Sequence, residues 1–137
     1  MQSDAARLAD TRAWLAKART DLRSAEHALA ASPPLAEDVA FHAQQAAEKA
    51  MKALLTWHDV PFRKTHSREE LGQQCVAVEP TPLALVDQAA PLTEYAWRFR
   101  YPGEDAPPTP EEVDGALQTA RAVVAAVSER LPQQARS

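Results

Sequence analysis

Cysteine, glycine and aromatic residues are scarce in this chain, and each shortage excludes or disfavours a class of protein fold. Cys75 is the only cysteine among 137 residues, so no disulfide can form within the chain and packing must hold the fold. Three glycines and 6% aromatic residues, beside abundant alanine and leucine, favour an all-helical protein over a sheet-rich one. No residue near Cys75 resembles a base paired with a thiolate, so we expect a small buried side chain there.

Long apolar runs are absent as well. The first ten residues lack the apolar stretch of a signal peptide, and no run approaches the ~20 apolar residues that span a bilayer. We therefore expect a soluble cytoplasmic protein with no membrane partner. The net charge of −4 argues against an obligate basic nucleic-acid binder, although a local basic patch is compatible with it.

Helical periodicity dominates the first part of the chain. Leucines recur every seven residues and predict a first helix from about residue 5 to 31, namely Leu8, Leu15, Leu22 and Leu29. The prolines at 33 and 34 end it. A second helix is expected from about 35 to 58, because Pro61 disfavours the helical conformation just before it. These two helices are expected to form an antiparallel hairpin.

Three further helices are expected after residue 60. A capping box of Ser67 and Glu70 begins a third helix that runs to about 78. A fourth begins near 83 and ends at Tyr101, and Thr109 or its neighbouring prolines begin a last one whose apolar stripe reaches Leu131. The pattern predicts an all-α, up-and-down bundle of four to five helices, a single domain over 1–137 with its core at about 5–131 and a frayed tail at 132–137.

The second expected helix is the most informative segment, because its polar side carries an aromatic residue. At about 100° per residue, one arc is apolar: Ala43, Ala46, Ala47, Ala50, Ala53, Leu54 and Trp57. The opposite arc holds Phe41 with Gln44, Gln45, Glu48, Lys49 and Lys52. Glu48 and Lys52 stand four residues apart, in the order that favours an intrahelical ion pair. A solvated face is therefore the simplest interpretation of this arc.

Two other segments concentrate positive charge. The loop at 61–68 is the densest basic patch of an acidic chain, and it precedes a helix N-terminus that can hold a phosphate; it contains Arg63, Lys64, His66 and Arg68. The segment 95–105 places Arg98 and Arg100 among aromatic residues, which suits phosphate binding or base stacking. A solvated loop and snorkelling arginines explain the same patterns equally well.

A metal site is not predicted. Asp38 and His42 stand four residues apart and could reach one cation, but no second helix face with histidines completes a set of ligands. A glycine-rich phosphate loop and a Ser/His/Asp arrangement are also missing from the sequence.

Three motifs, taken in order, resemble one family. They are Phe-His-Ala-Gln-Gln-Ala-Ala-Glu-Lys-Ala-Met-Lys-Ala-Leu-Leu at 41–55, Thr65-His66 before a short helix, and Arg100-Tyr101-Pro102 after an aromatic-rich helix. Over about residues 13–131 the chain resembles the HEPN domain, named for higher-eukaryote and prokaryote nucleotide-binding proteins. The resemblance implies a helical bundle that forms a homodimer with a cleft near the interface. Many prokaryotic members are encoded beside a minimal nucleotidyltransferase and form toxin and antitoxin pairs.

The chain differs from the ribonuclease branch of this family in one motif. That branch carries an arginine followed after four to six residues by a histidine, which supply charge stabilisation and acid/base chemistry. No histidine follows Arg98 or Arg100 at this spacing. The chain is thus more similar to the non-nuclease branch, which favours binding over catalysis.

Three interpretations stay open. The first is a homodimeric module that binds a nucleotide or another phosphate ligand, or pairs with a minimal nucleotidyltransferase, with ligand contacts from Gln45, Glu48, Lys49, Lys52, His66, Arg100 and Tyr101. The second is a divergent, metal-independent ribonuclease toxin that uses Arg100 and His66, with RNA the less favoured ligand. The third is a dimerising scaffold without a ligand, whose interface centres on Gln45 and Glu48. Apart from a nucleotide, no cofactor is expected.

Overall fold

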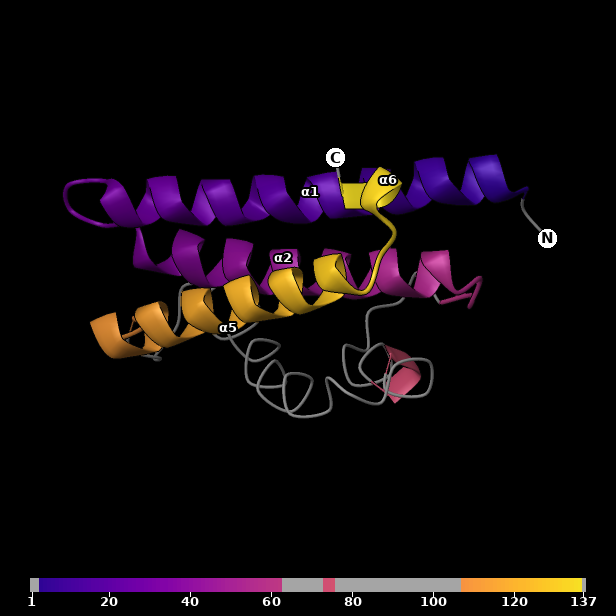
Figure 1. Ribbon diagram of the computed structural model, residues 1–137. Helices are drawn as coiled ribbons and strands as arrows, with labels where there is room; N and C mark the ends of the chain where they lie inside the picture. Colours follow the sequence, from indigo (N-terminus) through magenta and orange to yellow (C-terminus); the bar gives the residue numbers. More distant parts are fainter. Residues whose placement is uncertain (1–2, 63–72, 76–106, 137) are drawn as a thin grey trace.

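The computed structural model describes residues 3–62, 73–75 and 107–136 (Figure 1). These ranges contain the helices α1 (Asp4–Ala30), α2 (Ala36–Trp57), α5 (Pro110–Glu129) and α6 (Gln133–Arg136). The expected all-α bundle is confirmed. The helices expected at 67–78 and from 83 lie outside the described residues, except for 73–75, which are helical. None of the helices described here is long and apolar enough to cross a membrane.

The first two helices form the expected antiparallel hairpin, with bounds within one residue of the prediction (Figure 1). Ser3 caps α1, since its side-chain oxygen accepts a hydrogen bond from the amide of Ala6 at 3.2 Å. At the turn, the carbonyl of Ala28 accepts a hydrogen bond from the amide of Leu35 at 2.9 Å. Leu29 and Leu35 remain exposed at this end, so the leucine repeat of α1 is buried only along part of its length.

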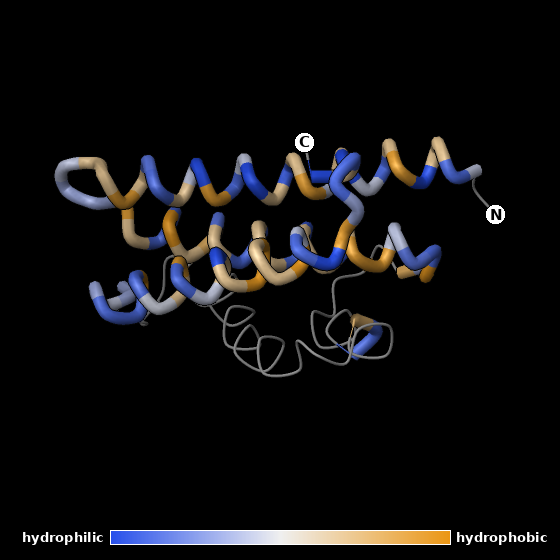
Figure 2. Tube along the Cα trace, viewed as in Figure 1, coloured by the Kyte–Doolittle hydropathy of each residue, from blue (hydrophilic) through white to orange (hydrophobic). Residues whose placement is uncertain are grey.

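The helix α2 is the centre of the bundle and packs against both α1 and α5. Its buried surface is rich in alanine, and Ala43, Ala46, Ala50 and Ala53 are all fully buried. Small side chains let helix axes approach closely, towards the lower end of the usual 8–10 Å separation. Figure 2 shows apolar residues where the three long helices face one another and hydrophilic turns on the outer side of α1.

The end of α2 is fixed by a Schellman motif. Asp59 has a φ of 57°, in the left-handed region, and its amide donates to the carbonyl of Thr56 at 3.1 Å. The amide of Val60 donates to the carbonyl of Leu55 at 2.9 Å, and Val60 packs against the core. The chain therefore leaves α2 in a defined direction, which places residues 60–62 beside α1.

The helix α5 begins with a capping box at Thr109. Thr109 was one of the two predicted starts, the other being the neighbouring prolines. The Thr109 hydroxyl accepts from the amide of Glu112 at 3.1 Å, and the Glu112 carboxylate accepts from the amide of Thr109 at 3.0 Å. The predicted apolar stripe is buried, with Val113, Leu117, Ala120, Val124 and Val127 all in the core. Leu131 is buried too, although it lies beyond the end of the helix.

The prediction of a frayed tail at 132–137 was wrong for residues 133–136, which form α6 and pack against α1, while Ser137 lies outside the described residues. Ala135 is only 1% exposed. Arg136 closes the turn by donating to the carbonyl of Leu131 at 2.8 Å, and the guanidinium of Arg19 donates to the carbonyl of Arg136 at 2.5 Å. Burial of Ala135, the bond from Arg19 on α1 and the bond from Arg136 to Leu131 outweigh the tendency of a chain end to fray.

Candidate functional site

A connected row of polar side chains runs along α2, and we call Gln44, Gln45, Glu48 and Lys52 the polar row. Glu48 is its centre, since one carboxylate oxygen accepts from the amide of Gln44 at 3.3 Å and the other lies 3.3 Å from the ammonium of Lys52. The amide of Gln45 donates to the side-chain oxygen of Gln44 at 2.9 Å. The ion pair predicted between Glu48 and Lys52 is therefore confirmed.

Three members of the polar row are buried and Gln45 is partly buried, so the interpretation of this arc as a solvated face was wrong for Glu48 and Lys52. Gln44 is 1% exposed, Glu48 3% and Lys52 7%. Periodicity shows which residues share a face but not what covers that face, and α2 is buried on nearly every side. Charges removed from water lose hydration free energy, which only good pairing offsets. The row meets this condition with hydrogen bonds between its own members.

Lys52 joins the polar row to two aromatic rings. Its ammonium lies 5.1 Å from the ring centroid of Trp14 on α1 and 5.6 Å from that of Phe62, which follows α2. Both distances are within the range of a cation–π interaction. The rings themselves meet edge to face, with centroids 5.9 Å apart and planes at 73°. The positive end of the row is thus stabilised by a carboxylate on one side and aromatic rings on the other.

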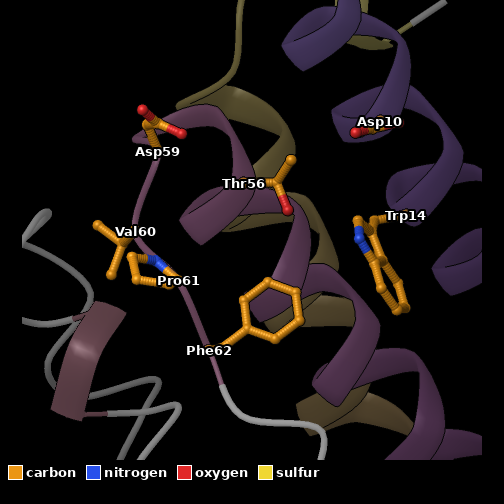
Figure 3. Close-up of a pocket in the computed structure, with 7 residues that line it drawn as sticks. All are labelled: Asp10, Trp14, Thr56, Asp59, Val60, Pro61 and Phe62. Atoms are coloured by element: carbon orange, nitrogen blue, oxygen red, sulfur yellow. The ribbon is translucent and has the colours of Figure 1, made fainter. Parts of the chain in front are cut away.

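A pocket with a volume of about 470 Å³ opens beside these rings, and we call it the aromatic pocket. Its described lining is Asp10, Trp14, Thr56, Asp59, Val60, Pro61 and Phe62 (Figure 3). In Figure 3, Asp59 and Asp10 lie on opposite sides of Thr56, with Trp14 below Asp10 and Phe62 below Thr56. The Schellman motif at the end of α2 puts Asp59 and Phe62 into this lining.

A second polar group joins α1 to α2, and we call Asp21, His42 and Lys49 the Asp21 cluster. One carboxylate oxygen of Asp21 lies 2.9 Å from Nδ1 of His42, and the other lies 2.5 Å from the ammonium of Lys49. A carboxylate only accepts here, so Nδ1 of His42 is the donor and Nε2 faces away from Asp21. The Asp21 side chain is 11% exposed, whereas His42 and Lys49 keep 31% and 26% of their side-chain surface.

The structure separates the predicted site residues into two groups. Gln45, Glu48 and Lys52 are brought together in the polar row, while Lys49 turns to Asp21 and forms no part of that row. The remaining predicted contacts lie outside the described residues: His66, Arg100 and Tyr101. His42 pairs with Asp21 instead of sharing a cation with Asp38. Among the described residues, no group of three or more His, Cys, Asp or Glu side chains could hold a metal ion.

Asp21 was not predicted as a site residue, although its position in an apolar stripe of α1 indicates a buried carboxylate. The buried residues of α1 follow a helical stripe of Thr11, Leu15, Ala18, Asp21, Ala25 and Ala28. A single carboxylate within such a stripe must meet a cation from another helix, because an unpaired buried charge is too costly. Trp14 and Phe62 carried no comparable signal, since aromatic residues near a helix face are ordinarily part of the core.

Cys75 has the predicted character of a buried thiol. It is 2% exposed and lies against α2, where its Sγ donates to the carbonyl of Met51 at 3.6 Å. Burial raises the pKa of the Cys75 thiol to about 12. At neutral pH the thiol is protonated, so Cys75 does not act as a nucleophile here.

Comparisons with known proteins identify what the chain is similar to. The model of the HEPN domain matches residues 11–131. The crystal structure of TT1696 from Thermus thermophilus is similar, with a TM-score of 0.71 and 33% sequence identity. The match covers 88% of this chain and 98% of that one. A comparison with curated proteins gave no match.

Proposed function

The chain belongs to the HEPN family, and we propose that it is a homodimeric binding protein for a nucleotide or another phosphate ligand that works beside a minimal nucleotidyltransferase. The buried polar row on α2 is the observation that carries this proposal. A purely structural helix at the centre of a bundle would be apolar on all sides. Three buried polar side chains, connected to the partly buried Gln45, favour a site with a demanding geometry, because burying them sacrifices hydration without adding apolar contact.

The charge balance on α2 limits which residues hold the phosphate. Lys52 is paired with Glu48 and Lys49 with Asp21, so these ion pairs leave no net positive charge on α2 for an anion. The proposed phosphate contacts that belong to neither pair are therefore His66 and Arg100, with Tyr101 as a stacking or hydrogen-bonding partner. In this proposal the polar row orients the ligand, and Lys49 and Lys52 contribute secondary contacts.

Calorimetric titration of the purified protein with ATP tests the ligand. We expect binding by the wild type and at least tenfold weaker binding by Arg100→Ala, since a charged contact to phosphate is lost. Arg23→Ala is the matched control, because Arg23 is an exposed arginine of α1 and its loss removes the same charge. Absence of heat with millimolar ATP, in wild type and variants alike, would contradict the nucleotide proposal.

Two measurements test the proposed homodimer and its nucleotidyltransferase partner: the molar mass in solution and co-purification. Light scattering should give about twice the 15.0 kDa of one chain, and a nucleotidyltransferase encoded by the adjacent gene should co-purify with the dimer. A monomer at micromolar concentration contradicts the dimer. Cleavage of RNA without metal, lost in both Arg100→Ala and His66→Ala, would replace binding by the ribonuclease interpretation.

A further inference from the structure

Gln45 is the accessible member of the polar row. It is only partly buried, whereas the other three members are buried. His42 and Lys49 lie three residues before and four residues after Gln45, so the three side chains fall within about 60° of one face of α2. We call His42, Gln45 and Lys49 the accessible edge. A ligand that contacts the polar row from solvent meets this edge first.

The accessible edge offers two acceptor atoms that the protein does not use. Nδ1 of His42 donates to Asp21 at 2.9 Å, so Nε2 of the neutral ring carries a lone pair. The side-chain nitrogen of Gln45 donates to Gln44 at 2.9 Å, which leaves the side-chain oxygen of Gln45 as an acceptor. The hydrogen bonds among the described residues include neither of these two acceptors. Both can therefore accept from a ligand.

The charges beside this edge cancel each other. The ammonium of Lys49 pairs with the carboxylate of Asp21, so the pair provides no net charge that would attract a phosphate. The same ammonium repels a second cation that approaches His42 or Gln45. Two acceptors beside a neutralised ion pair suit a neutral group that carries two hydrogen-bond donors.

We propose that the accessible edge binds the vicinal diol of a ribose. Nε2 of His42 and the side-chain oxygen of Gln45 each accept a hydrogen bond from one hydroxyl. Side chains three residues apart on a helix have Cβ atoms about 5–6 Å apart, so both can reach neighbouring hydroxyls of one sugar. The inference rests on the proposed nucleotide ligand and deepens it, because α2 then recognises the sugar and not the phosphate. It also makes His42 a ligand contact, which the sequence did not predict.

The imidazole of His42 is oriented before a ligand binds. Asp21 accepts from Nδ1 with one carboxylate oxygen, and Lys49 holds the other oxygen. The ring of Phe41 meets the imidazole edge to face, with centroids 5.3 Å apart. The imidazole nevertheless stays accessible, since 31% of the His42 side-chain surface is exposed. An acceptor held in this way loses little conformational entropy on binding.

Calorimetric titration of the whole chain with ATP and with 2′,3′-dideoxy-ATP tests the proposal. The two nucleotides share their base and phosphates and differ only in the hydroxyls. We expect ATP to bind roughly tenfold more tightly, because the dideoxy analogue loses two hydrogen bonds. Equal affinities would overturn the diol contact and leave nucleotide binding intact.

Methyl β-D-ribofuranoside, titrated alone, presents the same diol without a base or a phosphate. It distinguishes a free sugar from a nucleotide as the source of the hydroxyls. Binding of the riboside without binding of ATP would support the diol contact and contradict the nucleotide ligand. Absence of binding by both at millimolar concentration would contradict the two proposals together.

Variants of His42 separate ligand contact from structural support. His42→Asn keeps an amide nitrogen near the place of Nδ1 and removes Nε2, so it should weaken ATP binding about fivefold and leave dideoxy-ATP unchanged. His42→Gln places an amide oxygen near the position of Nε2 and should recover part of the ATP affinity. His27→Asn, at an exposed histidine of α1, is the control and should change neither. An equal loss for both nucleotides in His42→Asn, or no loss, with melting curves showing a folded variant, would refute the contact.

Discussion

The carboxylate of Asp21 on α1 lies 2.5 Å from the ammonium of Lys49 on α2, so one charge pair connects the two longest of the described helices. The same carboxylate also accepts from His42 at 2.9 Å. One acidic side chain in the middle of α1 thus sets the register of α1 against two turns of α2. Residues 21, 42 and 49 fix which faces of the helices meet.

Removing this carboxylate should destabilise the protein. We expect Asp21→Ala to lower the free energy of unfolding by about 2 kcal/mol, because it leaves two partly buried donors without their acceptor. Urea denaturation measures the change. Asp4→Ala is the control, since the side chain of Asp4 is 97% exposed and its pair with Arg7 should contribute almost nothing. Similar losses in the two variants would show that the Asp21 cluster has no special role in stability.

The polar row should depend on its central carboxylate. We expect Glu48→Ala to cost about 3 kcal/mol, since Gln44 and Lys52 would remain buried without their acceptor. Replacing Glu48 and Lys52 together by Leu and Met should recover much of that loss, because no buried charge remains. Equilibrium unfolding of the single and double variants gives both values. A double variant less stable than Glu48→Ala would contradict this account of the row.

Asp59 should be replaceable by glycine with a gain in stability. Its φ of 57° costs an L-residue conformational energy that glycine avoids. We expect Asp59→Gly to raise the free energy of unfolding by about 0.5–1 kcal/mol, and Asp59→Val to lower it, since β-branched residues tolerate this region poorly. Thermal denaturation separates the three proteins. A lower melting temperature for the glycine variant would contradict the backbone argument.

The stability of the protein should fall at alkaline pH because of Cys75. Burial raises the pKa of this thiol in the folded chain to about 12, from its ordinary value of 9.0, which applies once the chain unfolds. Above pH 9 the unfolded state releases the proton while the folded state keeps it, so stability declines as pH rises towards 12. Between pH 8 and 10 the wild type should lose about 1 kcal/mol more than Cys75→Ala. Parallel pH dependence in the two proteins would exclude this contribution.

The short helix α6 should contribute to stability despite its length. Ala135→Asp places an unpaired charge at a position that is 1% exposed, and we expect a loss of about 2 kcal/mol. Gln134→Asp introduces the same charge at an exposed position of the same helix and serves as the control. Chemical denaturation distinguishes them, and equal stability of the two variants would mean that α6 is not held against α1.

Local chemistry explains how well the helices could be predicted. The ends of α1, α2 and α5 depend on nearby residues, such as Ser3, Thr109 and the prolines that follow α1, so sequence alone placed them closely. The helix at 133–136 was missed because it is held by contacts with α1, such as the bond from Arg19, which is more than a hundred residues away. No local signal marks such a contact.

The candidate site was predicted only where its members share one helix. The pairing of Glu48 with Lys52 follows from a spacing of four residues. Other parts of the chain decide the rest of the site. They bury this pair, supply Asp21 as the partner of Lys49, and place two aromatic rings beside Lys52. Periodicity gives the direction of a side chain from its own helix, but its environment is decided by which helices pack against it.

The buried alanines of α2 determine how far apart the helices stand. At Ala43, Ala46, Ala50 and Ala53, all fully buried, α2 presents no more than a methyl group to its neighbours. A larger residue at any of them would push a helix outward, and a shift of about 1 Å would already lengthen the contact between Asp21 and Lys49 beyond an ordinary hydrogen bond. The alanines thus act as spacers, and the chemistry of the polar groups depends on residues that have no functional group of their own.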